Sequence, residues 1–231
     1  MNEEKLNTPE KVKEWLDLMG ITNYTINPKN LFINVKGDVD LSGKDLDNIP
    51  VQFIKVSGDF NCSTLNNLTS LKGVPIRVGR DFNCSYNNIT SLKYCPKKVG
   101  RDFNCSFNKL TSLKEAPKKL TVGRDFDCSS NSIESLEGAS NKIGRHFNCS
   151  FNKLTSLEGS PVLVNGNFIC AFNKITHLYG CPVKINKNFH IEFNKLVNLK
   201  DTPREIGGKL YCKSNPIINY SIDSKLSGLS A

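Results

Sequence analysis

The sequence lacks several features that would assign it to a common class of protein. No apolar run approaches the ~18 to 20 residues that a membrane span needs. The N-terminal segment MNEEKLNTPEKVKEWL is acidic and polar, so it lacks the basic start and apolar stretch of a signal peptide. Histidine is scarce, and no Cys-x-x-Cys or Cys/His spacing indicates zinc. We therefore expect no metal, no cofactor, no membrane partner and a cytoplasmic location.

Asparagine and cysteine are abundant instead. The chain of 231 residues contains 28 asparagines and nine cysteines. Its net charge of +9 is unevenly distributed, because residues 1–50 carry six basic and nine acidic side chains and residues 51–231 carry 25 and 13. Such a basic surface favours an anionic partner, either an acidic protein or a nucleic acid. An alternative is that these lysines only keep an extended repeat array soluble.

A short repeat fills most of the chain, as in VGRDFNCSFNKLTSLKEAP. Its phenylalanines recur at steps of 21 to 23 residues, and a leucine closes the series: Phe60, Phe82, Phe103, Phe126, Phe147, Phe168, Phe189 and Leu210. The two longer steps coincide with extra residues between the apolar positions. The repeat is therefore a structural coil whose loops absorb insertions.

Each coil alternates apolar and polar residues around its phenylalanine, which is typical of a half-buried strand. A proline usually ends the coil in an extended stretch. One coil cannot bury its own apolar side, so the coils must stack with their strands paired in parallel.

The run from Val78 through Phe82, Cys84 and Asn87 to Ile89, Leu92 and Pro96 resembles a leucine-rich repeat, with Phe and Cys at two leucine positions. It is most similar to the short repeats of bacterial and bacteriophage proteins with tandem Asp-Phe-x-Cys-Ser-x-Asn motifs, over about residues 37–217. The resemblance implies a leucine-rich-repeat solenoid with a curved parallel β-sheet on its concave face and extended or 3-10 convex segments. It also implies a phage-encoded protein that acts in a bacterial cell.

The predicted organisation has three parts. Residues 1–36 form a cap, with a helix that starts at Thr8-Pro9, stops at Gly20 and is followed by a hairpin. Residues 37–215 form the solenoid of about eight coils of 21–23 residues plus a degenerate first coil. Residues 216–231 form a closing tail.

Two columns of residues are predicted to be structural. Cysteines fill one repeat position, and Ile191 replaces one of them, so we expect reduced thiols in the core rather than disulfides. The resemblance implies that the repeated asparagines turn inward and bind backbone groups of neighbouring turns. They are Asn87, Asn108, Asn131, Asn152, Asn173, Asn194 and Asn215.

Three further columns are the candidate partner-binding residues. The basic ones are Arg80, Arg101, Arg124 and Arg145, and then Lys109, Lys153, Lys174 and Lys195. The aromatic ones are Tyr86, Phe107, Phe151, Phe172 and Phe193, with Ser130 as an interruption. The resemblance implies that the aromatic position is exposed, whereas strict strand alternation points it inward. If exposed, this apolar stripe predicts a protein interface.

Catalysis has little support in the sequence. An aspartate precedes each of several core phenylalanines, as at Asp59 and Asp81, but neighbouring arginines favour neutralising pairs. His146 and His190 are expected two coils apart, and no nucleophile motif or phosphate loop occurs. We predict a non-enzymatic binding protein that engages a host or phage protein with an acidic surface and inhibits or redirects it. The alternatives are a nucleic-acid-binding protein and a self-associating structural component.

Overall fold

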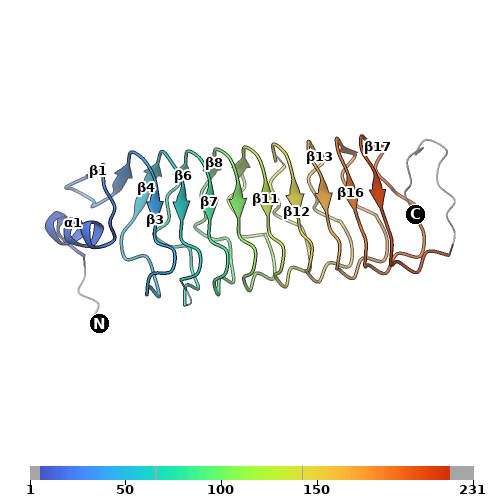
Figure 1. Ribbon diagram of the computed structural model, residues 1–231, viewed down its shortest axis with the longest axis horizontal. Coiled ribbons are helices and arrows are strands. Elements are labelled where there is room, and N and C mark those ends of the chain that lie inside the picture. The colour runs from blue at the N-terminus through green and yellow to red at the C-terminus, as the bar shows by residue number, and fades with distance from the viewer. Residues whose placement is uncertain (1–5, 66, 142, 219–231) are drawn as a thin grey trace.

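The structure is a computed structural model that describes residues 6–65, 67–141 and 143–218. Figure 1 shows an elongated stack of similar coils, with a helix at the N-terminal end and rows of short strands along the stack. The expected tail at 216–231 lies outside the described residues, apart from its first three positions. In the described part of the chain, no helix is long and apolar enough to cross a bilayer.

The N-terminal cap has the predicted helix and hairpin. Helix α1 (Pro9–Leu18) begins after Thr8, whose side chain accepts a hydrogen bond from the backbone N–H of Lys11 at 3.3 Å. Strands β1 (Tyr24–Ile26) and β2 (Ile33–Val35) pair in antiparallel fashion, and β2 pairs in parallel with β4 (Phe53–Val56). The hairpin therefore continues one sheet of the solenoid and covers its first coil.

The first row of strands is a nine-stranded parallel sheet in which each core phenylalanine pairs with the next. Eight strands come from the repeats, and β3 comes from the degenerate first coil, with Val39 opposite Phe60. In chain order the strands are β3 (Val39–Asp40), β5 (Phe60–Asn61), β7 (Phe82–Asn83), β9 (Phe103–Asn104), β11 (Phe126–Asp127), β12 (Phe147–Asn148), β14 (Phe168–Ile169), β16 (Phe189–His190) and β18 (Leu210–Tyr211).

A second row of strands precedes the first in each coil, which the sequence analysis did not predict. It is divided in two, because Ile143 forms only an isolated bridge with Val122. The longer part is β1, β2, β4 (Phe53–Val56), β6 (Arg77–Val78), β8 (Lys98–Val99) and β10 (Thr121–Val122). The shorter part is β13 (Leu163–Val164), β15 (Lys184–Ile185) and β17 (Glu205–Ile206).

The core lies between the two rows. The phenylalanine rings of the nine-stranded sheet are fully buried and stack along the axis with centroids 5.0–5.9 Å apart. At the corner between the rows, Gly100 lies so close to the preceding coil that a Cβ there would be 1.9 Å from the carbonyl oxygen of Gly79. Only glycine permits this approach.

The return segments are extended or turns, and the described residues contain no 3-10 helix. Their backbone bonds run between coils instead, as from the N–H of Lys109 to the carbonyl of Ile89 at 2.9 Å. The fold is a parallel β-solenoid of stacked coils, the arrangement that the resemblance to leucine-rich repeats implied, and its coils are bonded mainly to their neighbours.

Candidate functional site

The aromatic column consists of Tyr86, Phe107, Phe151, Phe172 and Phe193, and all five side chains are exposed, by 41–54%. Each has a left-handed backbone conformation, with φ between 52° and 55°. Thr64, Ser130 and Ser214 occupy the same position in other coils with similar φ values. The conflict left open by the sequence is therefore settled in favour of exposure.

The left-handed residue explains why strand alternation fails at this position. It reverses the alternation, so the ring points outward and the following asparagine points inward. Asn152, for example, is buried, and its amide donates to the carbonyls of Cys128, Cys149 and Ser150 at 3.0–3.2 Å. Its oxygen accepts from the N–H of Ile133 at 2.9 Å. The predicted asparagine ladder is confirmed. Because each asparagine points inward, the aromatic residue before it lies on the outer surface of the coil.

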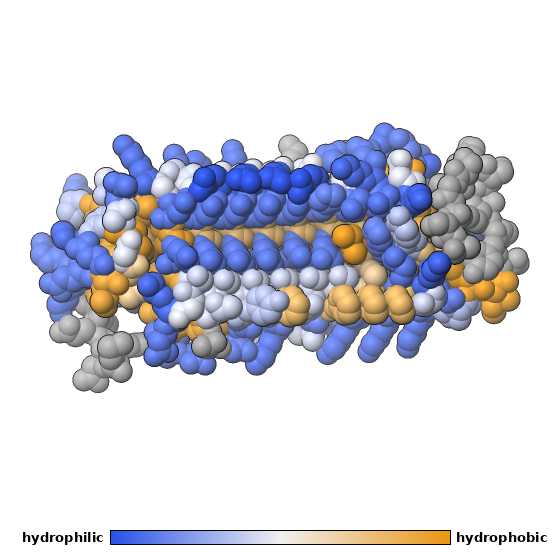
Figure 2. Space-filling view, in the orientation of Figure 1, coloured by the Kyte–Doolittle hydropathy of each residue, from blue (hydrophilic) through white to orange (hydrophobic). Residues whose placement is uncertain are grey.

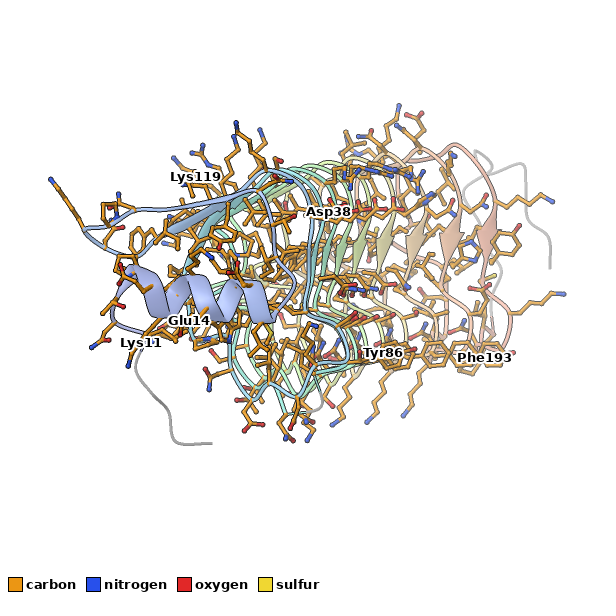
Figure 3. All side chains as sticks on the ribbon, turned by 60° about the vertical axis from the view of Figure 1, so that its left-hand side comes forward. Lys11, Glu14, Asp38, Tyr86, Lys119 and Phe193 are labelled. Carbon is orange, nitrogen blue, oxygen red and sulfur yellow. The ribbon has the colours of Figure 1, made fainter. Side chains whose placement is uncertain are left out.

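Neighbouring rings of the aromatic column are stacked face to face. The ring centroids of Tyr86 and Phe107 are 4.3 Å apart, and those of Phe151, Phe172 and Phe193 are 4.3 and 4.2 Å apart, with ring planes within 9° of parallel. Figure 3 shows the rings in line between the labelled Tyr86 and Phe193. Figure 2 shows a row of hydrophobic surface along the lower side of the molecule. Stacking covers the ring faces and presents the ring edges to solvent.

Lysines accompany the aromatic column two residues further along four coils. Lys109, Lys153, Lys174 and Lys195 are all exposed, and none forms an ion pair with a described residue. The structure therefore brings the aromatic and lysine columns together along one edge of the nine-stranded sheet. Such an edge, with apolar rings beside unpaired positive charges, could contact a partner whose surface carries negative charge around apolar side chains.

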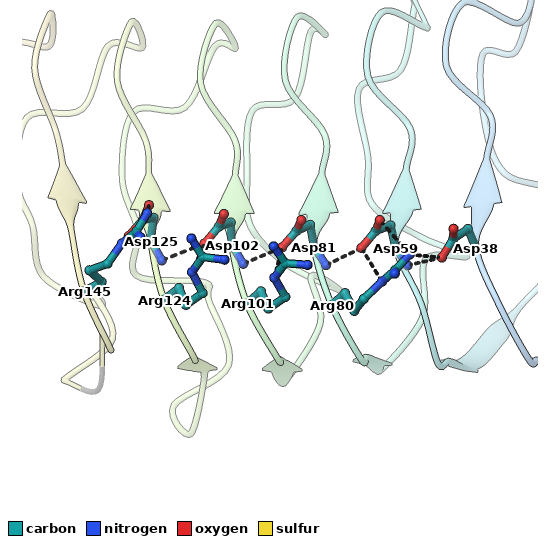
Figure 4. A network of polar contacts seen from close by, with 9 residues as sticks. All are labelled: Asp38, Asp59, Arg80, Asp81, Arg101, Asp102, Arg124, Asp125 and Arg145. Carbon is teal, nitrogen blue, oxygen red and sulfur yellow. Dashed lines mark hydrogen bonds and ion pairs between the residues drawn. The ribbon is translucent and has the colours of Figure 1, made fainter.

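The arginine column is separate from the aromatic one, and its side chains pair with aspartates of preceding coils (Figure 4). The guanidinium of Arg145 lies 2.6 Å from the carboxylate of Asp125, and that of Arg80 lies 2.6 Å from Asp38 and 3.0 Å from Asp59. The pairs of Arg101 with Asp81 and of Arg124 with Asp102 are longer, at 3.6 Å. The predicted neutralising pairs are confirmed, so these arginines contribute little free positive charge.

The aspartates also belong to a longer ladder that the sequence analysis missed. At the position before Val39 and before each core phenylalanine, a side chain accepts a hydrogen bond from the backbone N–H of the next coil at 2.8–3.1 Å. The acceptors are Asp38, Asp59, Asp81, Asp102, Asp125, His146, Asn167 and Asn188. The signal was available, since aspartate, histidine and asparagine share an acceptor atom near the backbone.

These contacts shift the pKa of several ladder residues. The backbone N–H of Asp59 lowers the pKa of Asp38. Burial opposes ionisation of Asp125, but the hydrogen bonds from Arg145 and from the N–H of His146 together lower its pKa. Burial lowers the pKa of His146, whose Nδ1 accepts from the N–H of Asn167 at 2.8 Å. That bond requires the neutral imidazole with its proton on Nε2.

All nine cysteines are free thiols. Those of the core column that precede Cys212 are fully buried, and burial raises the pKa of each, as at Cys149. Cys181 is half-buried, and burial raises its pKa to about 12. The buried thiols therefore act as small apolar groups in the core.

The remaining polar groups form no catalytic arrangement within the described residues. His146 belongs to the ladder before the core rings, whereas His190 lies after one and stacks on Tyr211 at 4.5 Å, so the two are not partners. No cluster of three or more described His, Cys, Asp or Glu residues has the geometry to hold a metal ion. A groove of about 420 Å³ between β10 and β13 is lined by aliphatic, glycine and a few polar residues, without an acidic or histidine side chain.

Comparison with known proteins gives little further information. No family model matches the sequence, and no curated protein matches it. Among solved structures, YopM from Yersinia enterocolitica WA-314 aligns with a TM-score of 0.35 and 18% identity. The alignment covers 77% of this chain and 52% of that chain, so this chain spans about half of its length.

Proposed function

We propose that this protein is a non-enzymatic binding scaffold that contacts a protein partner through its aromatic and lysine columns. The observation that supports this proposal is the row of five exposed aromatic residues held in register by the fold. Exposed apolar patches of this kind mark interaction surfaces, and buried aromatic anchors dominate binding energy in protein interfaces. The four unpaired lysines favour a partner with an acidic surface.

The resemblance of the repeats extends the proposal. A phage-encoded protein of this kind would act in a bacterial cytoplasm, where it would engage a host or phage protein and inhibit or redirect it. The partner's chemistry rests on the aromatic and lysine columns alone, so it does not depend on this origin.

Nucleic acid is the second candidate, favoured by the excess of positive charge after residue 50. Two features weaken it. The arginines are paired with aspartates, and most ring faces are covered by neighbouring rings, which leaves few faces for bases to stack on. Self-association through the aromatic column is the third candidate, and it predicts a mass by light scattering that rises with protein concentration.

The first test separates protein from nucleic acid. With a partner recovered from nuclease-treated bacterial lysate, Phe151→Ala and Phe172→Ala should each weaken binding by about 2 kcal/mol, because each removes a ring that the partner buries in the complex. Arg101→Ala and Arg124→Ala are the matched controls and should cost less than about 1 kcal/mol. A gel-shift titration with mixed-sequence oligonucleotides at about 50 and about 200 mM salt completes the test. Tight, salt-sensitive shifts that the arginine variants abolish would contradict the proposal.

A further inference from the structure

The aromatic column is interrupted at one internal position, between Phe107 and Phe151. Ser130 occupies the coil between them with the same left-handed backbone, φ 54°, as the flanking rings at 52° and 55°. The strands on both sides keep their register, since Phe126 pairs with Phe103 and with Phe147. The rings of Phe107 and Phe151 are therefore two coil steps apart with no ring between them.

The interruption has the dimensions of a slot for one planar ring. Elsewhere in the column one step separates ring centroids by 4.2–4.3 Å with nearly parallel planes. Two such steps open a gap of about 8.5 Å, in which a single inserted ring would stack on both faces. These inner faces of Phe107 and Phe151 are not covered by a neighbouring ring of the column. The fold accepts phenylalanine at this backbone conformation in four other coils, so the backbone does not impose the serine.

The floor of the slot is polar and reached by solvent. Ser130 and the ladder residues Asn108 and Asn131 are partly exposed, whereas Asn152 and Asn173 are at most 9% exposed. The Ser130 hydroxyl forms no hydrogen bond with any described residue, while both asparagine amides are fully used by the backbone. The hydroxyl is thus available to a guest that carries a polar group.

The charges around the slot select among planar guests. The lysine column has Lys109 and Lys153 on the two sides but Ser132 in the slot's own coil, and Glu134 replaces the threonine of neighbouring coils. An arginine guanidinium in the slot would meet the like charges of Lys109 and Lys153, whereas Glu134 and the missing third lysine reduce the positive charge that would attract the phosphate of a nucleotide. A neutral aromatic side chain depends on neither charge.

We propose that the slot over Ser130 binds one tyrosine or tryptophan side chain of the protein partner, sandwiched between Phe107 and Phe151. This inference rests on the proposed function and adds a specific determinant of recognition. The remaining rings of the column then provide contact area on either side of this anchor.

The test uses N-acetyltryptophanamide as the probe and the full-length protein, followed by NMR through the backbone amides of Ser130 and Asn131. The probe should shift these amides and bind with a Kd of about 1 mM, as two ring stacks allow. Ser130→Phe fills the slot and should weaken binding at least about tenfold. Ser214→Phe is the matched control, because it adds a ring beyond Phe193 at φ 58° and leaves the slot open.

Two results would overturn the inference. One is a probe that leaves the Ser130 amide unshifted or binds Ser130→Phe as well as wild type. The other is tighter binding of adenosine monophosphate or of N-acetylargininamide, which would assign the slot to a nucleobase or a guanidinium. If the probe fails while Phe151→Ala still loses the protein partner, the aromatic column remains the interface without this anchor. If the probe binds but no protein partner is found, the slot remains and the proposed function falls.

Discussion

At the position before each core phenylalanine, aspartate, histidine and asparagine perform the same task, since each accepts the backbone N–H of the next coil. The N-terminal coils use charged carboxylates, which also bind arginines, and the last coils use neutral amides. His146 lies where the two halves meet, between Asp125 and Asn167. The coil therefore requires a hydrogen-bond acceptor at this position, whether that acceptor is charged or neutral.

His146 makes the stability of the solenoid depend on pH. Its pKa in the folded chain is lowered from 6.5 by burial and by Arg145 and Lys187, against the opposing effect of Asp125 and Asp102. Because the folded chain has the lower pKa, the imidazole of the unfolded chain is protonated first as pH falls. The contribution of His146 to the free energy of unfolding is therefore complete above pH 6.5 and is lost as pH falls from 6.5 to the lowered pKa. His146→Asn should remove this loss, because asparagine accepts the same bond without titrating.

Denaturant midpoints at about pH 7.5 and about pH 5.5 measure this effect. His177→Asn is the control, since His177 lies outside the ladder and its ring contact is with Tyr179. Equal pH dependence in wild type and His146→Asn would exclude this role for the imidazole.

At the scale of the element, much of the coil structure could be predicted, because the same sequence pattern occurs in eight coils. The helix start at Thr8-Pro9, the hairpin and the buried rings follow from capping and alternation, whereas the inward asparagine ladder was implied by the resemblance. The second row of strands was missed, since each has only two residues in most coils and shows no alternation. The aromatic position was ambiguous because a single left-handed residue reverses the alternation. Its replacement by threonine or serine at Thr64, Ser130 and Ser214 was the signal for exposure.

The asparagine ladder offers a prediction within a single coil. Asn152→Ala leaves three backbone carbonyls and the N–H of Ile133 without their side-chain partner in a buried site, and should cost about 3 kcal/mol of unfolding free energy. Asn148→Ala should cost about 1 kcal/mol or less, because Asn148 bonds mainly to the nearby Ser150 on the outer face. Chemical denaturation of both variants compares them, and equal costs would contradict the inward role of Asn152.

At the scale of the whole molecule, the two edges of the nine-stranded sheet differ in how many uncommitted side chains they offer to a binding partner. Along one edge the arginines and aspartates neutralise each other, as Arg145 and Asp125 do. Along the other, exposed rings and unpaired lysines continue for much of the stack. The sequence placed all three columns in register and predicted that the arginines and aspartates neutralise each other. It did not show that Arg145 pairs with Asp125 of the preceding coil, because the two residues lie 20 positions apart in the sequence.

The most direct test is site-specific photocrosslinking in nuclease-treated bacterial lysate, with benzoylphenylalanine placed at Phe172 or, as the matched control, at Arg124 on the opposite edge. The account predicts a discrete crosslinked protein from position 172, little from position 124, and loss of the product when Phe151 and Phe193 are changed to alanine. A parallel reaction in lysate without nuclease completes the test. Crosslinks from position 124 alone, or a product at position 172 that forms only without nuclease, would contradict the claim that the aromatic column binds a protein.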